Sequence, residues 1–125
     1  MTFDWSQYLN VAKELTGQAT TPANQEAKSR TAISRAYYAA FLQARNHLRD
    51  KEGHLIPATA DAHNYVSAQF QLNPEQVRQS IGSKLKRLRG FRRQADYADR
   101  FPGLSGITQT AIELSGEVIA DLCNL

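Results

Sequence analysis

Apolar residues recur every three or four positions along most of the chain, which is the spacing of amphipathic α-helices. No stretch alternates convincingly between apolar and polar residues with a period of two, so the sequence predicts no strand. We therefore expect an all-α, up-and-down bundle of four to five helices, formed by residues 1–125 as a single domain. The predicted helices are residues 4–16, 22–50, 59–72, 74–98 and 107–122.

Two of these helices begin at recognisable start signals. Thr21-Pro22 predicts a cap followed by proline at the first helical position, and Asn73-Pro74 with Gln76 predicts the same at the fourth helix. The second helix carries apolar residues on two sides, because Tyr38 and Leu42 lie outside its main stripe. Such a helix is central in a bundle or faces a partner subunit.

The charge of the chain is concentrated in one segment of the fourth helix. The sequence has 15 basic and 12 acidic residues, and six of the basic ones lie in residues 84–93, which contain no acid. Without that segment the chain is mildly acidic, so the segment is what an anionic partner would encounter. Its cations are Lys84, Lys86, Arg87, Arg89, Arg92 and Arg93.

Several functional classes are excluded by composition. A single cysteine, Cys123, allows neither a disulfide framework nor a multi-cysteine zinc site, and no histidines and carboxylates share a close metal-ligand spacing. We expect no metal and no cofactor. No apolar run approaches the roughly 20 residues of a membrane span, and the N-terminus lacks the pattern of a signal peptide. We therefore expect a cytoplasmic protein that does not contact a membrane.

Arg92 lies where the apolar stripe of the fourth helix requires an apolar residue. A charge in that position must be paired, because an unpaired buried charge costs several kcal/mol. Asp96, four residues later, is the nearest partner along the helix. Two roles therefore stay open for Arg92: an internal staple joining helices, which is the commoner role, or a ligand of phosphate in a cleft.

The other five cations spread around the helix rather than lining one face. They indicate either a solvated surface, partly paired with Glu113, Glu117 and Asp121, or a surface that follows a phosphate backbone. Tyr97 and Phe91 would add stacking for unpaired bases.

Two motifs resemble the small HEPN (higher eukaryotes and prokaryotes nucleotide-binding) domain proteins. The segment 34–41 contains an R-x-Y-Y-A-x-F pattern with Arg35, Tyr37 and Tyr38, and the segment 88–97 ends in R-x-x-A-D-Y. The helix with His63, Val66 and Phe70 is similar to the intervening helix of the family. The resemblance covers roughly residues 25–100, and the order and separation of the two motifs carry it.

The resemblance implies a helical bundle, frequent dimerisation and association with RNA or nucleotides. Many members are metal-independent ribonucleases of toxin–antitoxin or antiviral systems, often encoded beside a nucleotidyltransferase. Their activity rests on an R-x(4–6)-H motif, but here Tyr97 stands where the histidine after Arg92 would be. An unperturbed tyrosine, with a pKa near 10, is a poor base at neutral pH. A second match to the R-x(4–6)-H pattern runs from Arg49 to His54. It lies at the end of a helix, and so loose a pattern often occurs by chance.

We thus predict a HEPN-like module that binds RNA or a nucleotide through its fourth helix, as a homodimer in a toxin–antitoxin or defence context. Arg92 would hold phosphate and be oriented by Asp96, and Tyr97 would stack or hydrogen-bond. Arg89 and Arg93 would add phosphate contacts, and Arg35 and Tyr38 would line the opposing wall or the dimer seam.

Two alternatives to this prediction remain. One is a metal-independent ribonuclease whose catalytic candidates are Arg92, Tyr97 and His63, the last being otherwise a core or capping histidine. The other is a non-catalytic interaction module paired with a nucleotidyltransferase.

Overall fold

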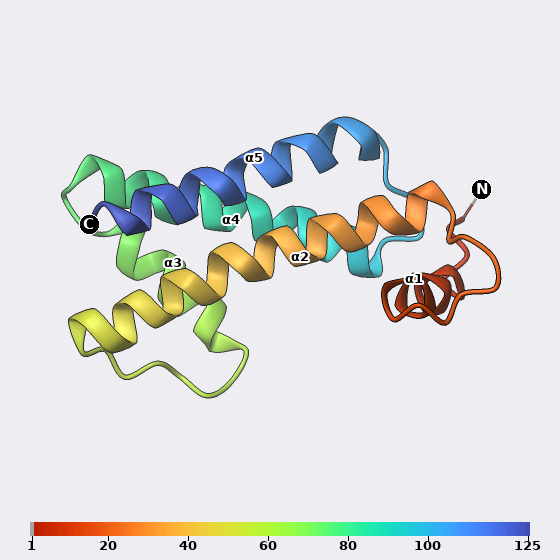
Figure 1. Ribbon diagram of the computed structural model, residues 1–125. Coiled ribbons are helices and arrows are strands. Elements are labelled where there is room, and N and C mark those ends of the chain that lie inside the picture. Colours follow the sequence, from red (N-terminus) through yellow and green to blue (C-terminus); the bar gives the residue numbers. More distant parts are fainter. Residues whose placement is uncertain (1) are drawn as a thin grey trace.

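The computed structural model, which describes residues 2–125, is built from helices and contains no strand in that part of the chain (Figure 1). The all-α bundle predicted from the sequence is confirmed. Its elements are α1 (Gln7–Leu15), α2 (Gln25–Asn46), the π-helical turn η1 (His47–Lys51), α3 (Asp61–Gln71), α4 (Gln76–Tyr97) and α5 (Leu104–Cys123).

Helix α2 is central, as its two apolar sides predicted, because it packs against α4 and α5 along its length and also contacts α1 and α3. Helix α4 runs antiparallel to α2 and α5, while α1 lies across one end of the bundle (Figure 1). Burying this apolar surface is the main stabilising contribution to the fold. The core contains Ile33, Tyr37, Phe41, Leu48, Val66, Phe70, Ile81, Leu85, Leu88, Ala111, Leu114 and Val118.

Of the helix starts that differ from the predicted ones, three have a local reason. Helix α2 begins at Gln25 rather than at Pro22, because the Asn24 side chain accepts a hydrogen bond from the backbone N–H of Ala27 at 2.8 Å and caps the helix. Asn73 binds the backbone N–H of Glu75 instead of capping α4, which starts at Gln76.

Helix α5 starts at Leu104, three residues earlier than predicted. Gly103 has a φ of 72°, so it turns the chain directly into the helix.

A buried arginine fastens the C-terminal end of α4 to α2. Arg30 has no exposed surface, and its Nη1 donates to the carbonyl of Ala95 at 3.0 Å and of Ala98 at 2.6 Å. Its guanidinium carbon lies 4.3 Å from the centre of the Phe3 ring, which brings the N-terminal segment onto the same group. The apolar periodicity of α2 included Arg30 without indicating this anchoring role.

Among the described helices, none combines the length and the apolar character needed to cross a membrane.

Candidate functional site

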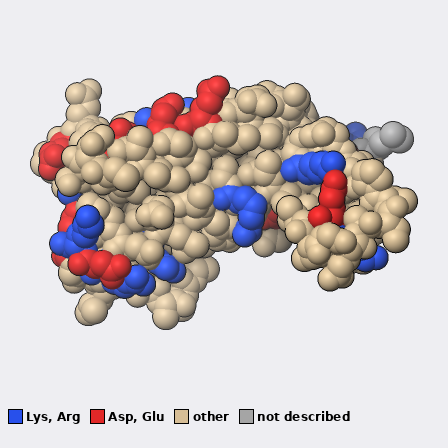
Figure 2. Space-filling view, viewed as in Figure 1, with Lys and Arg blue, Asp and Glu red and all other residues tan. Residues whose placement is uncertain are grey.

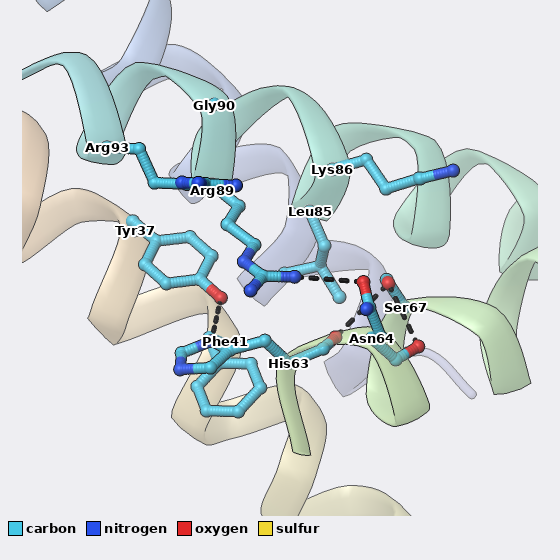
Figure 3. Close-up of a pocket in the computed structure, with 10 residues that line it drawn as sticks. All are labelled: Tyr37, Phe41, His63, Asn64, Ser67, Leu85, Lys86, Arg89, Gly90 and Arg93. Carbon is cyan, nitrogen blue, oxygen red and sulfur yellow. Dashed lines mark hydrogen bonds between the residues drawn. The ribbon is translucent and has the colours of Figure 1, made fainter. Parts of the chain in front are cut away.

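A pocket of about 160 Å³ opens between α2, α3 and α4, and we call it the α4 pocket (Figure 3). One wall is α4, which contributes cations and a glycine, and the opposite side is formed by aromatic and polar side chains of α2 and α3. No acidic residue lines it. The lining residues are Tyr37, Phe41, His63, Asn64, Ser67, Leu85, Lys86, Arg89, Gly90 and Arg93.

Three cations of the pocket lie on one face of α4. Lys86, Arg89 and Arg93 are spaced by three and four residues, which is one face of a helix. Within residues 2–125, none of them has a carboxylate within 4 Å. Arg89 is held in place by Asn64, whose Oδ1 accepts from its Nη1 at 2.8 Å. The expectation that the cations spread around the helix is therefore wrong for these three, because their spacing matches the helical turn.

The remaining cations of the basic segment serve other contacts. Lys84 forms ion pairs with Glu117 at 3.0 Å and Asp121 at 3.8 Å, which join α4 to α5. Figure 2 shows acidic side chains gathered along the α5 edge of the molecule. The guanidinium of Arg87 lies over the Phe91 ring at 5.8 Å. The solvated, paired role thus applies to Lys84, whereas the three pocket cations have no acidic partner in the described part of the chain.

The pocket also holds a stacked histidine. The His63 ring lies 4.4 Å from the Phe41 ring, and its Nδ1 shares a short hydrogen bond with the hydroxyl of Tyr37. Burial lowers the pKa of His63, and the charges of Arg89 and Arg92 lower it further. Burial likewise raises the pKa of Tyr37 to about 12, so both groups are neutral at pH 7. Where the phenol donates to Nδ1, the imidazole proton is on Nε2, which can then donate to an anion.

Arg92 lies behind this pocket in a cluster of tyrosines. Its side chain is only 10 % exposed, and its guanidinium carbon lies 5.5 Å from the ring centres of Tyr37 and Tyr38 and 6.0 Å from that of Tyr97. The nearest carboxylate is Asp96, as expected, but the two are 3.9 Å apart. The buried Nε of Arg92 has no hydrogen-bond partner among residues 2–125. Arg92 is therefore shielded from water and held by cation–π contacts and one long ion pair rather than by hydrogen bonds.

Asp96 is positioned by other helices rather than by Arg92. Its carboxylate accepts hydrogen bonds from the Tyr8 hydroxyl and the Ser34 hydroxyl, both at 3.1 Å. Burial and the Asp96 charge raise the pKa of Tyr8, which keeps this phenol protonated as a donor. Asp96 thus ties α4 to α1 and α2 and approaches Arg92 only at the distance of a loose ion pair.

Arg35 and Tyr38, which are predicted to line the opposing wall, do not line the α4 pocket. Arg35 lines a second hollow of about 400 Å³ between α1 and α2, together with Leu15 and Asp96, and its guanidinium lies 5.2 Å from the Tyr38 ring. The structure therefore divides the predicted site residues among three neighbouring places. Arg89, Arg93 and His63 line the α4 pocket; Arg92, Tyr38 and Tyr97 form the aromatic cluster; Arg35 and Asp96 line the second hollow.

Sequence reasoning missed several pocket residues. Lys86 was part of the basic segment but not of the predicted site, although its spacing from Arg89 and Arg93 was visible. Tyr37 belongs to the Y-Y pattern and is absent from the predicted site residues. Asn64 carried no signal, because its role follows from the packing of α3 against α4.

A comparison with protein-family models matches residues 6–125 to the HEPN domain. The chain belongs to the HEPN domain family. This family is one of RNA-related and nuclease-like modules, and its members are often dimeric. No match was found among curated proteins, and none among solved structures.

The HEPN ribonuclease motif has no counterpart in the α4 pocket. Tyr97 stands at the position of the motif histidine and is 72 % exposed. The two ends of the second match to the R-x(4–6)-H pattern make other contacts. Arg49 pairs with Asp50 at 2.7 Å, and His54 Nδ1 shares a hydrogen bond with the Tyr65 hydroxyl at 2.7 Å. Neither end of that match lines the pocket. Within residues 2–125, no three His, Cys, Asp or Glu side chains lie close enough together to hold a metal ion.

Proposed function

We propose that this HEPN domain binds RNA or a nucleotide, and that phosphates of this ligand lie in the α4 pocket. The observation that carries the proposal is the set of three cations, Lys86, Arg89 and Arg93, which share one pocket and have no acidic partner among residues 2–125. Cations left unpaired at a concave surface attract an anionic ligand, and each phosphate they neutralise releases counterions.

Each residue has a distinct role in this proposal. Arg89, held by Asn64, supplies a fixed fork of donors to a phosphate, and Arg93 supplies a more mobile cation. Tyr97, exposed one helical turn beyond Arg93, offers a face for a base. Arg92 supports the site from behind the tyrosines by adding positive potential, with Asp96 loosely paired to it.

Arg35 extends the positive surface away from the pocket on the α2 side, and Tyr38 offers an aromatic ring 5.2 Å from its guanidinium. They would meet the strand after it leaves the pocket.

A salt titration of RNA binding tests the proposal. Fluorescence anisotropy with a short labelled single-stranded RNA should give an affinity that falls steeply with salt. Arg89→Ala and Arg93→Ala should each weaken binding and reduce the slope of log K against log salt by about 0.7. Lys84→Ala is the matched control, because it removes a cation of the same helix that already pairs with α5. An equal loss in the control, or no loss in the pocket variants, would contradict the proposal.

A metal-independent ribonuclease is the second candidate, and one observation favours it. His63 lies in the same pocket as Arg89 and Arg93 and is neutral at pH 7, and in the tautomer whose Nδ1–H donates to the Tyr37 hydroxyl its Nε2 lone pair is free to act as a general base. Incubating the protein with RNA in EDTA discriminates the two functions. Cleavage that is lost in His63→Ala supports the enzyme, and intact RNA under all conditions leaves only binding.

The biological setting proposed here follows from membership of the family. We propose a cytoplasmic homodimer, in which residues 1–125 act as a single domain, within a toxin–antitoxin or defence system and with a partner such as a nucleotidyltransferase. A partner-docking module without RNA binding is the remaining alternative. Light scattering gives the mass of the assembly, and co-purification with the product of a neighbouring gene, together with no salt-sensitive RNA binding, would favour the docking module.

A further inference from the structure

Helix α4 contains two interior glycines, and packing explains only one of them. A Cβ atom added at Gly82 would lie 2.7 Å from the carbonyl oxygen of Ser67 and 2.7 Å from the backbone nitrogen of Gln71, so α3 crosses α4 too closely for any side chain. A Cβ added at Gly90 would meet no atom within 4 Å. Nothing in residues 2–125 therefore requires a glycine at position 90.

Gly90 has a cost, because glycine in the interior of an exposed helix is less favourable than alanine by about 1 kcal/mol. Openness alone does not indicate a function, since Gly116 of α5 is equally open. Gly90 differs from Gly116 in its position relative to the pocket. Gly90 is exposed and lines the α4 pocket, one turn from Lys86 on one side and from Arg93 on the other (Figure 3).

The missing side chain leaves the backbone of α4 accessible at the centre of the cationic face. Lys86 and Arg93 are seven residues apart, or about 10 Å along the helix axis, with Gly90 between them. A group that lies against Gly90 is therefore reached by a cation from each side and by Arg89 from the adjacent position. Glycine offers no surface for stacking, so the group that suits this position is anionic rather than aromatic.

We propose that the sugar–phosphate backbone of a single RNA strand lies directly against the α4 backbone at Gly90, which makes this glycine a determinant of ligand binding. The inference rests on the proposed RNA-binding function. An enclosed cavity of about 150 Å³ holds one benzene ring, so the α4 pocket, at about 160 Å³, has room for a single group of that size, such as one phosphate of the strand.

Gly90→Ala separates stability from binding. The methyl group fills open space in the free protein, so Tm should rise by about 3 °C. The same methyl keeps the RNA backbone away from α4, so the affinity for a short single-stranded RNA should fall about tenfold through the lost close packing of the strand against the helix. The salt slope should stay unchanged, because no cation is removed.

Gly116→Ala is the matched control and should raise Tm by a similar amount without changing the affinity. A Gly90→Ala protein that binds RNA like the wild type overturns this inference and leaves the proposed function standing. A lower Tm also overturns it, because the methyl would then clash within the chain. If the wild-type protein binds no RNA and Arg89→Ala changes nothing, the proposed function fails and the inference fails with it.

Discussion

The two buried arginines should differ sharply in their contribution to stability. Arg30→Met removes a guanidinium that has no exposed surface and keeps a side chain of similar length. It deletes the bonds to the carbonyls of Ala95 and Ala98 at 3.0 and 2.6 Å and the contact with the Phe3 ring at 4.3 Å. Arg92→Met deletes no hydrogen bond within residues 2–125 and only one ion pair, at 3.9 Å.

The magnitudes follow from these contacts. Each hydrogen bond from a charged donor contributes about 1.5–3 kcal/mol, and the carbonyl of Ala98 would be left without its partner, whereas that of Ala95 keeps a bond from the Tyr8 hydroxyl at 2.8 Å. We therefore expect Arg30→Met to lower the free energy of unfolding by about 3–5 kcal/mol. For Arg92→Met the loss is one long ion pair and some cation–π attraction, and a destabilisation of about 1 kcal/mol is expected.

Urea unfolding followed by far-UV circular dichroism measures both variants. With a slope near 2 kcal/mol per M, the Arg30→Met midpoint should fall by about 2 M and the Arg92→Met midpoint by about 0.5 M. Equal losses would refute the reasoning, since Arg92 would then be a structural staple like Arg30 and would have no reason to be kept for a ligand.

Four further predictions test single contacts. Gly82→Ala should destabilise the protein by about 1–3 kcal/mol in the same urea assay, because the methyl overlaps the backbone of α3. Arg89→Ala should raise the pKa of His63 towards its ordinary value, measured by an NMR titration of the imidazole, and a falling or unchanged pKa would contradict the assigned cause. The wild-type chain should lose stability as the pH falls below about 6.5, because the unfolded chain binds the His63 proton more tightly, and His63→Gln should reduce that loss. Lys84→Ala should cost less than about 1 kcal/mol, since its partner Glu117 is half exposed.

The helices could be predicted from the sequence because α2, α4 and α5 each bury a continuous stripe at helical spacing. The residues at which the helices start were harder to predict. The Pro22 and Pro74 signals are genuine local preferences, but Asn24 caps α2 with its side chain and the chain enters α4 through a turn at Asn73. A local pattern therefore predicts the region in which a helix starts. It does not determine which of several neighbouring residues caps the helix.

The site was harder to predict, because it depends on how helices meet. The basic segment pointed to α4, and the spacing of Lys86, Arg89 and Arg93 was enough to place them on one face. The roles of Tyr37 and Asn64 depend on the contacts of α2 and α3 with α4, which no local pattern encodes. For the same reason Arg30, in an apolar stripe without any motif, could not be recognised as an anchor.

The central claim is that the three pocket cations, and not the net charge of the chain, bind RNA. Two triple variants with the same change in charge test it: Lys86, Arg89 and Arg93 to Gln, against the exposed Lys13, Lys51 and Arg100 to Gln. The measurement is the slope of log K against log salt for a short single-stranded RNA. The pocket variant should lose about 2 units of slope and most of its affinity while the surface variant keeps both, and equal losses in the two proteins would contradict the account.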